Sequence, residues 1–384
     1  MLTTTNKKSK IPQQNSENSI TIGIATTLED KESIYRFRYQ TYVEEMDKHF
    51  PGIDHHKKLL YDDRDKWALH ISAKIGSKLI GTSQINIGKF NDFSREQAET
   101  FSLADFQNYP EIADRIFAFI TKIMVTPAFR NTPALYLLMA KCAKIVYETN
   151  TKFVFGACNF HLLPLYEQLG FYRYTKNFFE PGSGLLVPLV SPINDIHHLH
   201  AVRSPLYRIA RKRCEVTTTS VDWFYDKFIN NSPIINTQLV TEENLWLALY
   251  EQLVYPPTQV ISLLHKLTTE EAKIFLHNCG IYVHCYPGDQ ITTQGDVSYS
   301  YNILISGQLK SLTFCHPAKS YATPGQSFGA NGLTEHNNHV EDIVATTPAE
   351  ILVLSGIAFQ RFYHTHPNIA HKLVQTMLNL KNNG

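Results

Sequence analysis

The sequence predicts an α+β protein: a mixed sheet with helices on both faces, then a helical linker, then a C-terminal β-roll with a long final helix. Two stretches carry this prediction. Between residues 120 and 174, an apolar strand, a helix and a second apolar strand follow one another, which is the order of a parallel crossover unit. After residue 258, short apolar runs alternate with glycine-containing turns, as in a small β-roll.

These patterns divide the 384 residues into four parts. We expect a disordered tail over residues 1–19, a first domain over 20–190, a helical linker over 191–257 and the β-roll over 258–384. The tail contains lysines but no apolar core, which argues against a signal peptide.

Composition excludes several classes of protein. The net charge is +1 at pH 7, with 43% hydrophobic and 18% charged residues, so no overall field favours nucleic acid or a membrane, and we expect no nucleic-acid partner. The six cysteines form no C-x-x-C pair, which indicates reduced thiols and a cytoplasmic protein. No apolar run approaches the ~18 residues of a membrane span.

The elements before the crossover unit follow from local patterns. A strand over 20–25 and a helix over 28–46 open the first domain. Two β-rich runs, 67–74 and 79–87, are joined by a turn that contains Gly76, which predicts a hairpin. Ser94 and Gln97 form the capping-box pattern of a helix over 94–106.

The crossover unit starts with a strand over 120–125. Thr132 as N-cap and Pro133 at the first helical position predict the start of the next helix. A strand over 153–158 and a short helix that holds Tyr166 and ends at Gly170 follow. Where a strand runs into a helix N-terminus, unpaired backbone N–H groups and the helix dipole form an anion site. The helix after Pro133 has its apolar residues at core-facing spacing: Leu135, Leu138, Met139, Cys142, Ile145 and Val146.

Four motifs occur along this domain in order: Phe37-Arg38-Tyr39-Gln40-Thr41-Tyr42 with Glu45; Asp62, Asp65 and His70; Val125-x-Pro127-x-x-Arg130; and Leu165-Tyr166-x-x-Leu169-Gly170-Phe171. Over about residues 21–190, their order and spacing resemble the GNAT acyltransferases. Within that superfamily, the sequence is similar to N-acyl amino acid synthases and to acyl-homoserine-lactone (autoinducer) synthases.

The resemblance implies transfer of an acyl group from a thioester to an amine. The backbone N–H of Val125 would hold the oxyanion, and Tyr166 would protonate the leaving thiolate. The loop of Arg130, Asn131 and Thr132, together with Val125, would bind a phosphate of pantetheine or coenzyme A. The implied donor is an acyl-CoA or an acyl-acyl carrier protein.

On the acceptor side, the resemblance implies that Arg38, Asp62 and Asp65 form an ion network that binds a small amine or an amino acid. Surface ion pairs are the alternative for the two aspartates, which lie in a charged loop. His70 and His161 are the candidate general bases, although a lone histidine in a strand is more often structural. An amine that arrives deprotonated needs no base.

The sequence departs from the family pattern in two places. Where acetyl-CoA loops have glycines, Pro133 and Leu135 stand, and without glycine the backbone approaches a pyrophosphate less closely. This favours a longer acyl donor over acetyl-CoA. On the strand before Arg130, the relatives tend to carry Glu and Arg, whereas this chain has Phe119 and Lys122, so a carboxylate base is missing.

The linker contains two polar segments. Residues 197–200 read HHLH, but no acidic residue or cysteine stands at ligand spacing, so we expect no metal site. Residues 202–214 are basic and are interpreted as a helix with either a solvated face or a docking surface for an acidic carrier protein or a lipid surface. Further amphipathic helices are expected over 223–229 and 242–253.

Turn motifs of the β-roll resemble the cyclic-nucleotide-binding domain: Pro287-Gly288-Asp289, Gln294-Gly295-Asp296, Ile305-Ser306-Gly307 and Gly325-x-x-Phe328-Gly329. In that family, a cassette after Phe-Gly supplies a Glu for the ribose and an Arg for the cyclic phosphate. Here Phe328 and Gly329 precede Ala330 and His339 at those positions, so both charged groups are absent. We therefore expect no cyclic-nucleotide binding, and a roll that serves as a dimerisation or interaction module.

Three functions remain open. The preferred hypothesis is an N-acyltransferase that moves a fatty acyl group onto an amino-acid-like amine. The second is a protein lysine acetyltransferase controlled by cyclic nucleotide, which Ala330 and His339 disfavour. The third is a non-catalytic sensor or scaffold, which Phe119 and Lys122 keep open.

Overall fold

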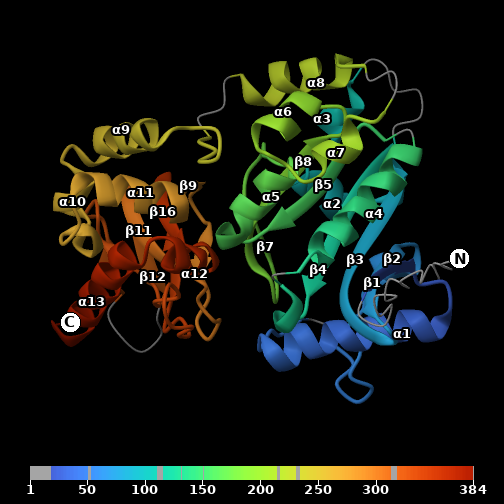
Figure 1. Cartoon of the computed structure of the whole chain (residues 1–384), viewed down its shortest axis with the longest axis horizontal. Coiled ribbons are helices and arrows are strands. Elements are labelled where there is room, and N and C mark those ends of the chain that lie inside the picture. Colours follow the sequence, from blue (N-terminus) through green and yellow to red (C-terminus); the bar gives the residue numbers. More distant parts are fainter. Residues whose placement is uncertain are drawn as a thin grey trace, which may run out of the picture.

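The computed structural model describes residues 19–50, 53–109, 116–130, 132–149, 151–213, 217–230, 234–312 and 318–383. These residues form two domains that lie side by side (Figure 1). The first domain holds strands β1 to β8, and the second, orange to red, holds β9 to β16. Apart from Ser19, the tail predicted over 1–19 lies outside the described residues.

Eight strands of the described chain form the mixed sheet of the first domain, in the order β1-β2-β3-β4-β5-β8-β6 with β7 beside β8. Strands β4 and β5 are parallel and are joined by a helix, whereas the other neighbouring strands are antiparallel. The predicted mixed sheet is therefore confirmed. The strands are β1 (Ile20–Ile24), β2 (Leu69–Ile75), β3 (Lys78–Lys89), β4 (Ile116–Val125), β5 (Phe153–Cys158), β6 (Tyr172–Arg173), β7 (Phe178–Glu180) and β8 (Gly184–Pro192).

Helices cover both faces of this sheet, as predicted. On one face, α4 and α5 pack on residues such as Ala118 and Ile120. On the other face, α2, α3 and α8 enclose an aromatic cluster that contains Phe117 and Phe119. The helices are α1 (Leu28–Tyr39), α2 (Arg95–Thr100), α3 (Leu103–Gln107), α4 (Ala134–Glu148), α5 (Leu163–Leu169), α6 (Ile196–Ala201), α7 (Tyr207–Ala210) and α8 (Thr219–Phe224). The other helical segments are π-helical, η2 (Gln40–Glu45) and η7 (Tyr225–Ile229), or 3-10, η3 (Asp63–Lys66), η4 (Phe90–Asp92), η5 (Pro127–Phe129) and η6 (Phe160–Leu162).

The core-facing stripe predicted for α4 is confirmed except at its start, where Leu135 is half-buried. The predicted N-cap is wrong by one residue, because Pro133 occupies the cap position. Thr132 still supports the helix start, since its Oγ1 accepts a hydrogen bond from the N–H of Ala134 at 3.3 Å.

Other boundaries also differ from the predictions. The helix predicted over 94–106 is broken at Ser102, whose φ of +48° leaves the helical region. The long final helix is two helices, α12 (Gly356–Thr365) and α13 (Pro367–Asn383), because Pro367 has no N–H to continue the first helix. Within the basic segment 202–214, only α7 is a regular helix, and Cys214 lies outside the described residues.

The second domain is a β-roll, as predicted. Its described strands form two four-stranded sheets, β10-β15-β12-β13 and β14-β11-β16-β9. The strands are β9 (Gly280–Cys285), β10 (Gln290–Thr292), β11 (Ser300–Ser306), β12 (Leu309–Leu312), β13 (Ser320–Tyr321), β14 (Ser327–Phe328), β15 (Asp342–Ala345) and β16 (Ala349–Ser355). Together with α12 and α13, the helical elements are α9 (Glu242–Leu253), α10 (Pro257–Val260), η8 (Ser262–Leu264) and α11 (Thr269–Cys279).

The stretch 191–257, predicted as a linker, contributes helices to both domains. Phe224 of α8 packs into the aromatic cluster of the first domain, whereas Leu245 and Leu249 of α9 pack into the roll. The domain limits at 190 and 258 stay predictions. In the part of the chain that the structure describes, every helix is too short or too polar to cross a membrane.

Candidate active site

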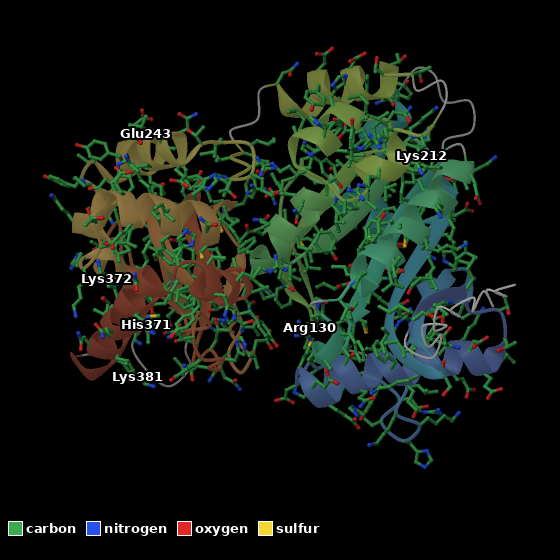
Figure 2. All side chains as sticks on the ribbon, in the orientation of Figure 1. Arg130, Lys212, Glu243, His371, Lys372 and Lys381 are labelled. Carbon is green, nitrogen blue, oxygen red and sulfur yellow. The ribbon has the colours of Figure 1, made fainter. Side chains whose placement is uncertain are left out.

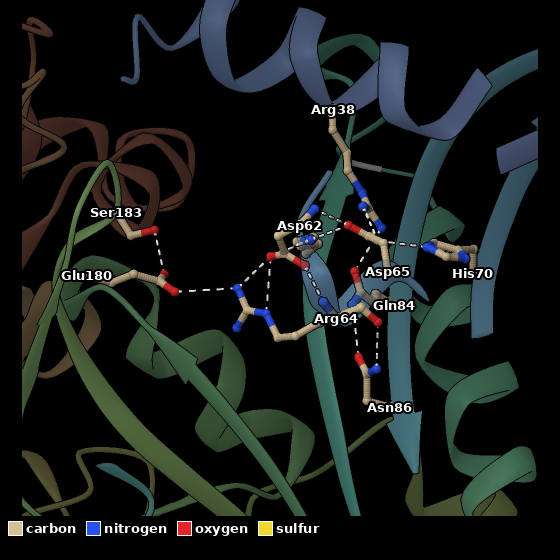
Figure 3. Close-up of polar contacts among 10 residues, drawn as sticks. Arg38, Asp62, Arg64, Asp65, His70, Gln84, Asn86, Glu180 and Ser183 are labelled. Atoms are coloured by element: carbon tan, nitrogen blue, oxygen red, sulfur yellow. Dashed lines mark hydrogen bonds and ion pairs between the residues drawn. The ribbon is translucent and has the colours of Figure 1, made fainter. Parts of the chain in front are cut away.

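A buried charge network lies where α1, η3, β2 and β4 meet (Figure 3). Oδ1 of Asp65 accepts a hydrogen bond from Nη1 of Arg38 at 2.6 Å and lies 2.7 Å from Nε2 of His70. Oδ2 of Asp65 accepts a hydrogen bond from Nζ of Lys122 at 2.8 Å. Arg38 and His70 are both fully buried. Residues from two of the sequence motifs, together with Lys122 of β4, thus meet at one carboxylate.

Asp62 joins this network to the surface. Its backbone N–H donates to Oδ2 of Asp65 at 2.8 Å, which closes the capping box of η3. Its carboxylate pairs with Nζ of Lys122 at 2.9 Å and with Nη2 of Arg64 at 2.8 Å. Arg64 also lies 3.6 Å from Oε1 of Glu180 on β7. Because the Asp62 side chain is 36% exposed, this edge of the network reaches solvent, whereas Asp65 does not.

A β-bulge places Lys122 in the network. Two residues of β4, Lys122 and Ile123, stand opposite Ser83 alone on β3, and Lys122 has a φ of +49°. Ile120 faces α4, so regular alternation would also turn Lys122 to that face. The bulge instead turns the lysine to the face on which α1 and Asp65 lie.

Polar side chains of β3 extend the network through hydrogen bonds. Oε1 of Gln84 accepts a hydrogen bond from Nη2 of Arg38 at 3.0 Å, and Nε2 of Gln84 donates to Oδ1 of Asn86 at 2.9 Å. Nδ2 of Asn86 donates to the carbonyl of Arg64 at 2.9 Å. Sequence reasoning missed Gln84, Asn86 and Arg64. The available signal was the alternation of Gln84 and Asn86 with isoleucines along one strand.

The electrostatics hold the two carboxylates of the network ionised. Burial alone would raise the pKa of Asp65, but the contact with His70 and the charges of Arg38 and Lys122 outweigh it and hold that pKa well below its usual range. Burial lowers the pKa of Lys122, and the neighbouring Arg38 lowers it further. For Asp62, burial is again outweighed by Lys122 and Arg64, so its pKa is lowered too.

The predicted donor loop lies next to the bulge. Strands β4 and β5 pair only at Ala118 and Phe119, so the rest of β4 has an open edge on that side. The N–H of Thr126 bonds the carbonyl of Ile80 on β3, and alternation in an antiparallel ladder then turns the N–H of Val125 toward the open edge. A backbone donor that points to this edge is what an oxyanion site requires.

Arg130 also lies on this side, and Figure 2 shows it where the first domain faces the roll. Its Nε donates to the carbonyl of Val125 at 3.3 Å. Thr132 uses its hydroxyl within the turn, where it donates to the carbonyl of Phe129 at 2.7 Å. Asn131, the third loop residue predicted to bind the donor, lies outside the described residues.

Tyr166 lies on α5, which ends at Gly170 with a φ of +104°. The phenol ring packs edge-on against Phe171, with centroids 5.8 Å apart, and its hydroxyl has no hydrogen-bond partner among the described residues. Burial raises the pKa of Tyr166, and the nearby Cys158 and Tyr42 raise it further, so the phenol stays protonated at neutral pH. A protonated, unpaired phenol can donate a proton to a leaving group.

Neither candidate base lies free in solvent. His70 is fully buried against Asp65, and the ring of His161 stacks on Tyr299 of the roll with centroids 5.1 Å apart. Burial, with the charges of Lys48 and His336, lowers the pKa of His161 to about 3, so its imidazole is neutral. The assignment of a general base stays a prediction.

The nucleotide cassette of the roll is occupied by its own side chains. The N–H of Ala330 donates to Nδ1 of His339 at 3.0 Å, beside Gly329 and the buried Phe328. Burial lowers the pKa of His339 to about 4, so this ring brings no positive charge to the site. The carboxylate of Glu341 accepts hydrogen bonds from the hydroxyls of Ser311 and Tyr321, so an anion stands inside the roll.

The HHLH segment forms α6. His198 is buried and stacks on Tyr172, with ring centroids 3.9 Å apart. Across the described ranges, no group of three or more His, Cys, Asp or Glu side chains is arranged to hold a metal ion.

A family model and several solved structures match parts of this chain. Residues 282–366 match the family model of the cyclic nucleotide-binding domain. The roll has that fold. The N-terminal domain of a transcriptional regulator from Streptomyces coelicolor A3(2) is similar to it, with 17% identity over 33% of this chain and 91% of that chain and a TM-score of 0.30. No curated protein sequence matches this chain.

Two solved structures resemble the other half. FeeM, an N-acyl amino acid synthase from uncultured soil microbes, is 13% identical over 50% of this chain and 98% of its own, with a TM-score of 0.37. A protein from Lactobacillus plantarum that is described as a candidate N-acetyltransferase is 12% identical over 46% of this chain and 99% of its own, with a TM-score of 0.32. Likenesses at these scores decide nothing about substrates.

Proposed function

We propose that the chain is an N-acyltransferase that moves a fatty acyl group from a thioester to the amine of an amino-acid-like acceptor, with the roll as a regulatory or oligomerisation domain. The observation that carries this proposal is the position of the charge network. Arg38 of α1, Asp62 and Asp65 of η3 and its N-cap, and Lys122 of β4 meet beside the open edge of β4, toward which the N–H of Val125 points.

The charges at the edge of the network suit a zwitterionic acceptor. An amino acid presents an ammonium group and a carboxylate a few ångströms apart. The half-exposed Asp62 fits the ammonium group, and Arg64 and Lys122 fit the carboxylate. Asp65, locked by its partners, holds Lys122 and Arg38 in place rather than touching the acceptor.

The donor is an acyl-CoA or an acyl-acyl carrier protein, bound at Arg130 and the N-terminus of α4. The ammonium group of the acceptor first loses a proton to water; the neutral amine then attacks the thioester carbon, and the N–H of Val125 stabilises the oxyanion. When the C–S bond breaks, the thiolate takes the proton of Tyr166, and the extra proton of the new amide returns through water to the phenolate, which restores Tyr166. The bulky Pro133 and Leu135 at the start of α4 support a long-chain donor over acetyl-CoA.

Control by cyclic nucleotide is disfavoured by the contents of the roll. His339 caps the backbone donor that a phosphate would use, and the carboxylate of Glu341 would repel the phosphate. A cytoplasmic location is supported by Cys142, Cys158, Cys279 and Cys285, which are free and buried.

Lipid profiling tests the proposed function. Cells that express the chain are expected to accumulate a new N-acyl amino acid, and cells that express Tyr166→Phe are expected to accumulate far less. Tyr250→Phe, at an exposed tyrosine on α9, is the matched control and leaves the product unchanged. If no N-acylated product distinguishes the wild type from an empty vector, the proposal is wrong.

A further inference from the structure

A buried arginine connects the helix of Tyr166 to the roll. Nε of Arg173 on β6 donates to Oε1 of Glu167 on α5 at 2.8 Å. Nη1 of Arg173 donates to the carbonyl of Tyr282 on β9 at 2.8 Å, and Nη2 donates to the carbonyl of Ile235. The guanidinium group thus contacts α5, the roll and the segment before α9 at once.

Other contacts hold the same stretch of the first domain. Oγ of Ser355, at the end of β16, donates to the carbonyl of His161 at 3.1 Å, just before α5. The ring of His161 stacks on Tyr299 of the roll. Nε2 of Gln238 donates to the carbonyl of Pro164 within α5. Contacts from the roll and its leading segment therefore flank Tyr166 on both sides in sequence.

The ion pair of Glu167 and Arg173 is costly to bury, so its geometry matters. The two residues are 2% and 7% exposed, and Oε2 of Glu167 has no hydrogen-bond partner among the described residues. Burial raises the pKa of Glu167, and Arg173 opposes that rise. Such a pair adds little net stability, but it fixes the relative positions of the elements it joins. Lysine cannot replace Arg173, because only the planar, extended guanidinium group reaches these three acceptors, which lie in three directions.

We infer that Arg173 is a positioning residue for the proposed acid: it ties Glu167 to the roll, and the docked roll thereby fixes the place of Tyr166 at the donor edge. The inference rests on the proposed function for its catalytic consequence. It gives the roll a role in acyl transfer that needs no bound nucleotide.

Fluorine NMR tests the positioning directly, without any substrate. In the full chain labelled with 3-fluorotyrosine, the signal of Tyr166 is assigned by its loss in Tyr166→Phe. Arg173→Lys keeps the positive charge but loses the fork, and it is expected to shift or broaden this signal. Glu167→Gln, of nearly the same shape, is expected to do the same and serves if Arg173→Lys does not fold. Arg95→Lys, at an exposed pair with Glu99, is the matched control and leaves the signal in place.

A double-mutant cycle tests the catalytic consequence in the purified chain, with a long-chain acyl-CoA and a mixture of amino acids. Arg173→Lys is expected to lower kcat about tenfold, with the KM for the acyl-CoA little changed. In the Tyr166→Phe background, it is expected to have no further effect on kcat. An equal loss of rate in both backgrounds, or an unchanged Tyr166 signal in folded Arg173→Lys, overturns the inference. If the wild type transfers no acyl group while the signal still shifts, the proposed function fails and the positioning by Arg173 stands.

Discussion

Asp65 shows how one side chain organises the candidate site. One of its carboxylate oxygens contacts Arg38 and His70, and the other contacts Lys122. Arg38 comes from a helix, whereas His70 and Lys122 come from strands. Arg38, Asp62, Asp65 and His70 could be predicted from the sequence, because each belongs to a motif with a recognisable spacing. The role of Lys122 could not be predicted, because regular two-residue alternation along β4 would point its side chain to the opposite face. Only the bulge, a consequence of packing between strands, reverses its direction.

The Asp65→Asn substitution is expected to destabilise the fold by about 3 kcal/mol at pH 7, because it leaves Arg38 buried without its counter-ion. The pKa of Asp65 is depressed in the folded state, so its contribution is present above the unfolded value of about 4 and is lost as pH falls through the lower folded value. Urea unfolding at several pH values checks this. The gap between wild type and variant should be constant from about pH 5 to 7 and shrink below about pH 4. A gap that persists undiminished in strong acid would contradict the account.

At the scale of single elements, α5 depends on how it ends. Gly170 has a φ of +104°, and a Cβ at this position would lie 2.4 Å from Cδ2 of Leu199. The sequence predicted this helix end, since glycine is the common residue there. It could not predict that the same glycine also makes room for a side chain of α6, which depends on tertiary packing.

The Gly170→Ala substitution should therefore destabilise the fold in two ways, through backbone strain at the positive φ and through a steric clash with Leu199. The matched control is Gly76→Ala, because Gly76 also has a positive φ, +56°, but meets nothing within 4 Å. The control should cost about 1 kcal/mol, and Gly170→Ala should cost clearly more. Chemical denaturation of the two variants measures the difference. Equal losses would show that Leu199 yields freely and that the helix end is not tightly packed.

The roll has the fold of the cyclic nucleotide-binding domain but lacks the Glu and the Arg of the nucleotide cassette. Its turns could be predicted, because each needs glycine at a defined place. Ala330 and His339 show in the sequence that the cassette positions lack a Glu and an Arg, but Glu341 was not singled out, since nothing in the sequence says that it points inward beside Ser311 and Tyr321.

Titration calorimetry with cAMP and cGMP is expected to give no binding signal at ligand concentrations up to about 1 mM, because the roll offers a neutral His339 and an anionic Glu341 to the phosphate. Micromolar binding of either nucleotide would contradict this reading of the roll. A far-UV circular dichroism spectrum of the same sample checks that the protein is folded, so that a missing signal is not caused by unfolding.

At the scale of the molecule, the two domains share a continuous apolar core. Buried residues of the first sheet, such as Val187 and Leu189, belong to one cluster with Val283 and Ile351 of the roll. The order of the domains was predictable from the change of pattern near residue 258. Their close packing was not, because contacts such as that of Arg173 with Tyr282 join residues far apart in the chain.

The central claim is that this chain transfers an acyl group to an amino-acid-like amine and that Tyr166 provides the proton for the leaving thiolate. The most direct measurement supplies the purified chain with a series of acyl-CoA and acyl-acyl carrier protein thioesters and a mixture of amino acids, and follows N-acyl products by mass spectrometry. We predict an N-acyl amino acid whose rate of formation falls about 10²- to 10⁴-fold in Tyr166→Phe and is unchanged in Tyr250→Phe. Absence of any N-acyl product with every donor, or an equal rate in Tyr166→Phe, would contradict the claim.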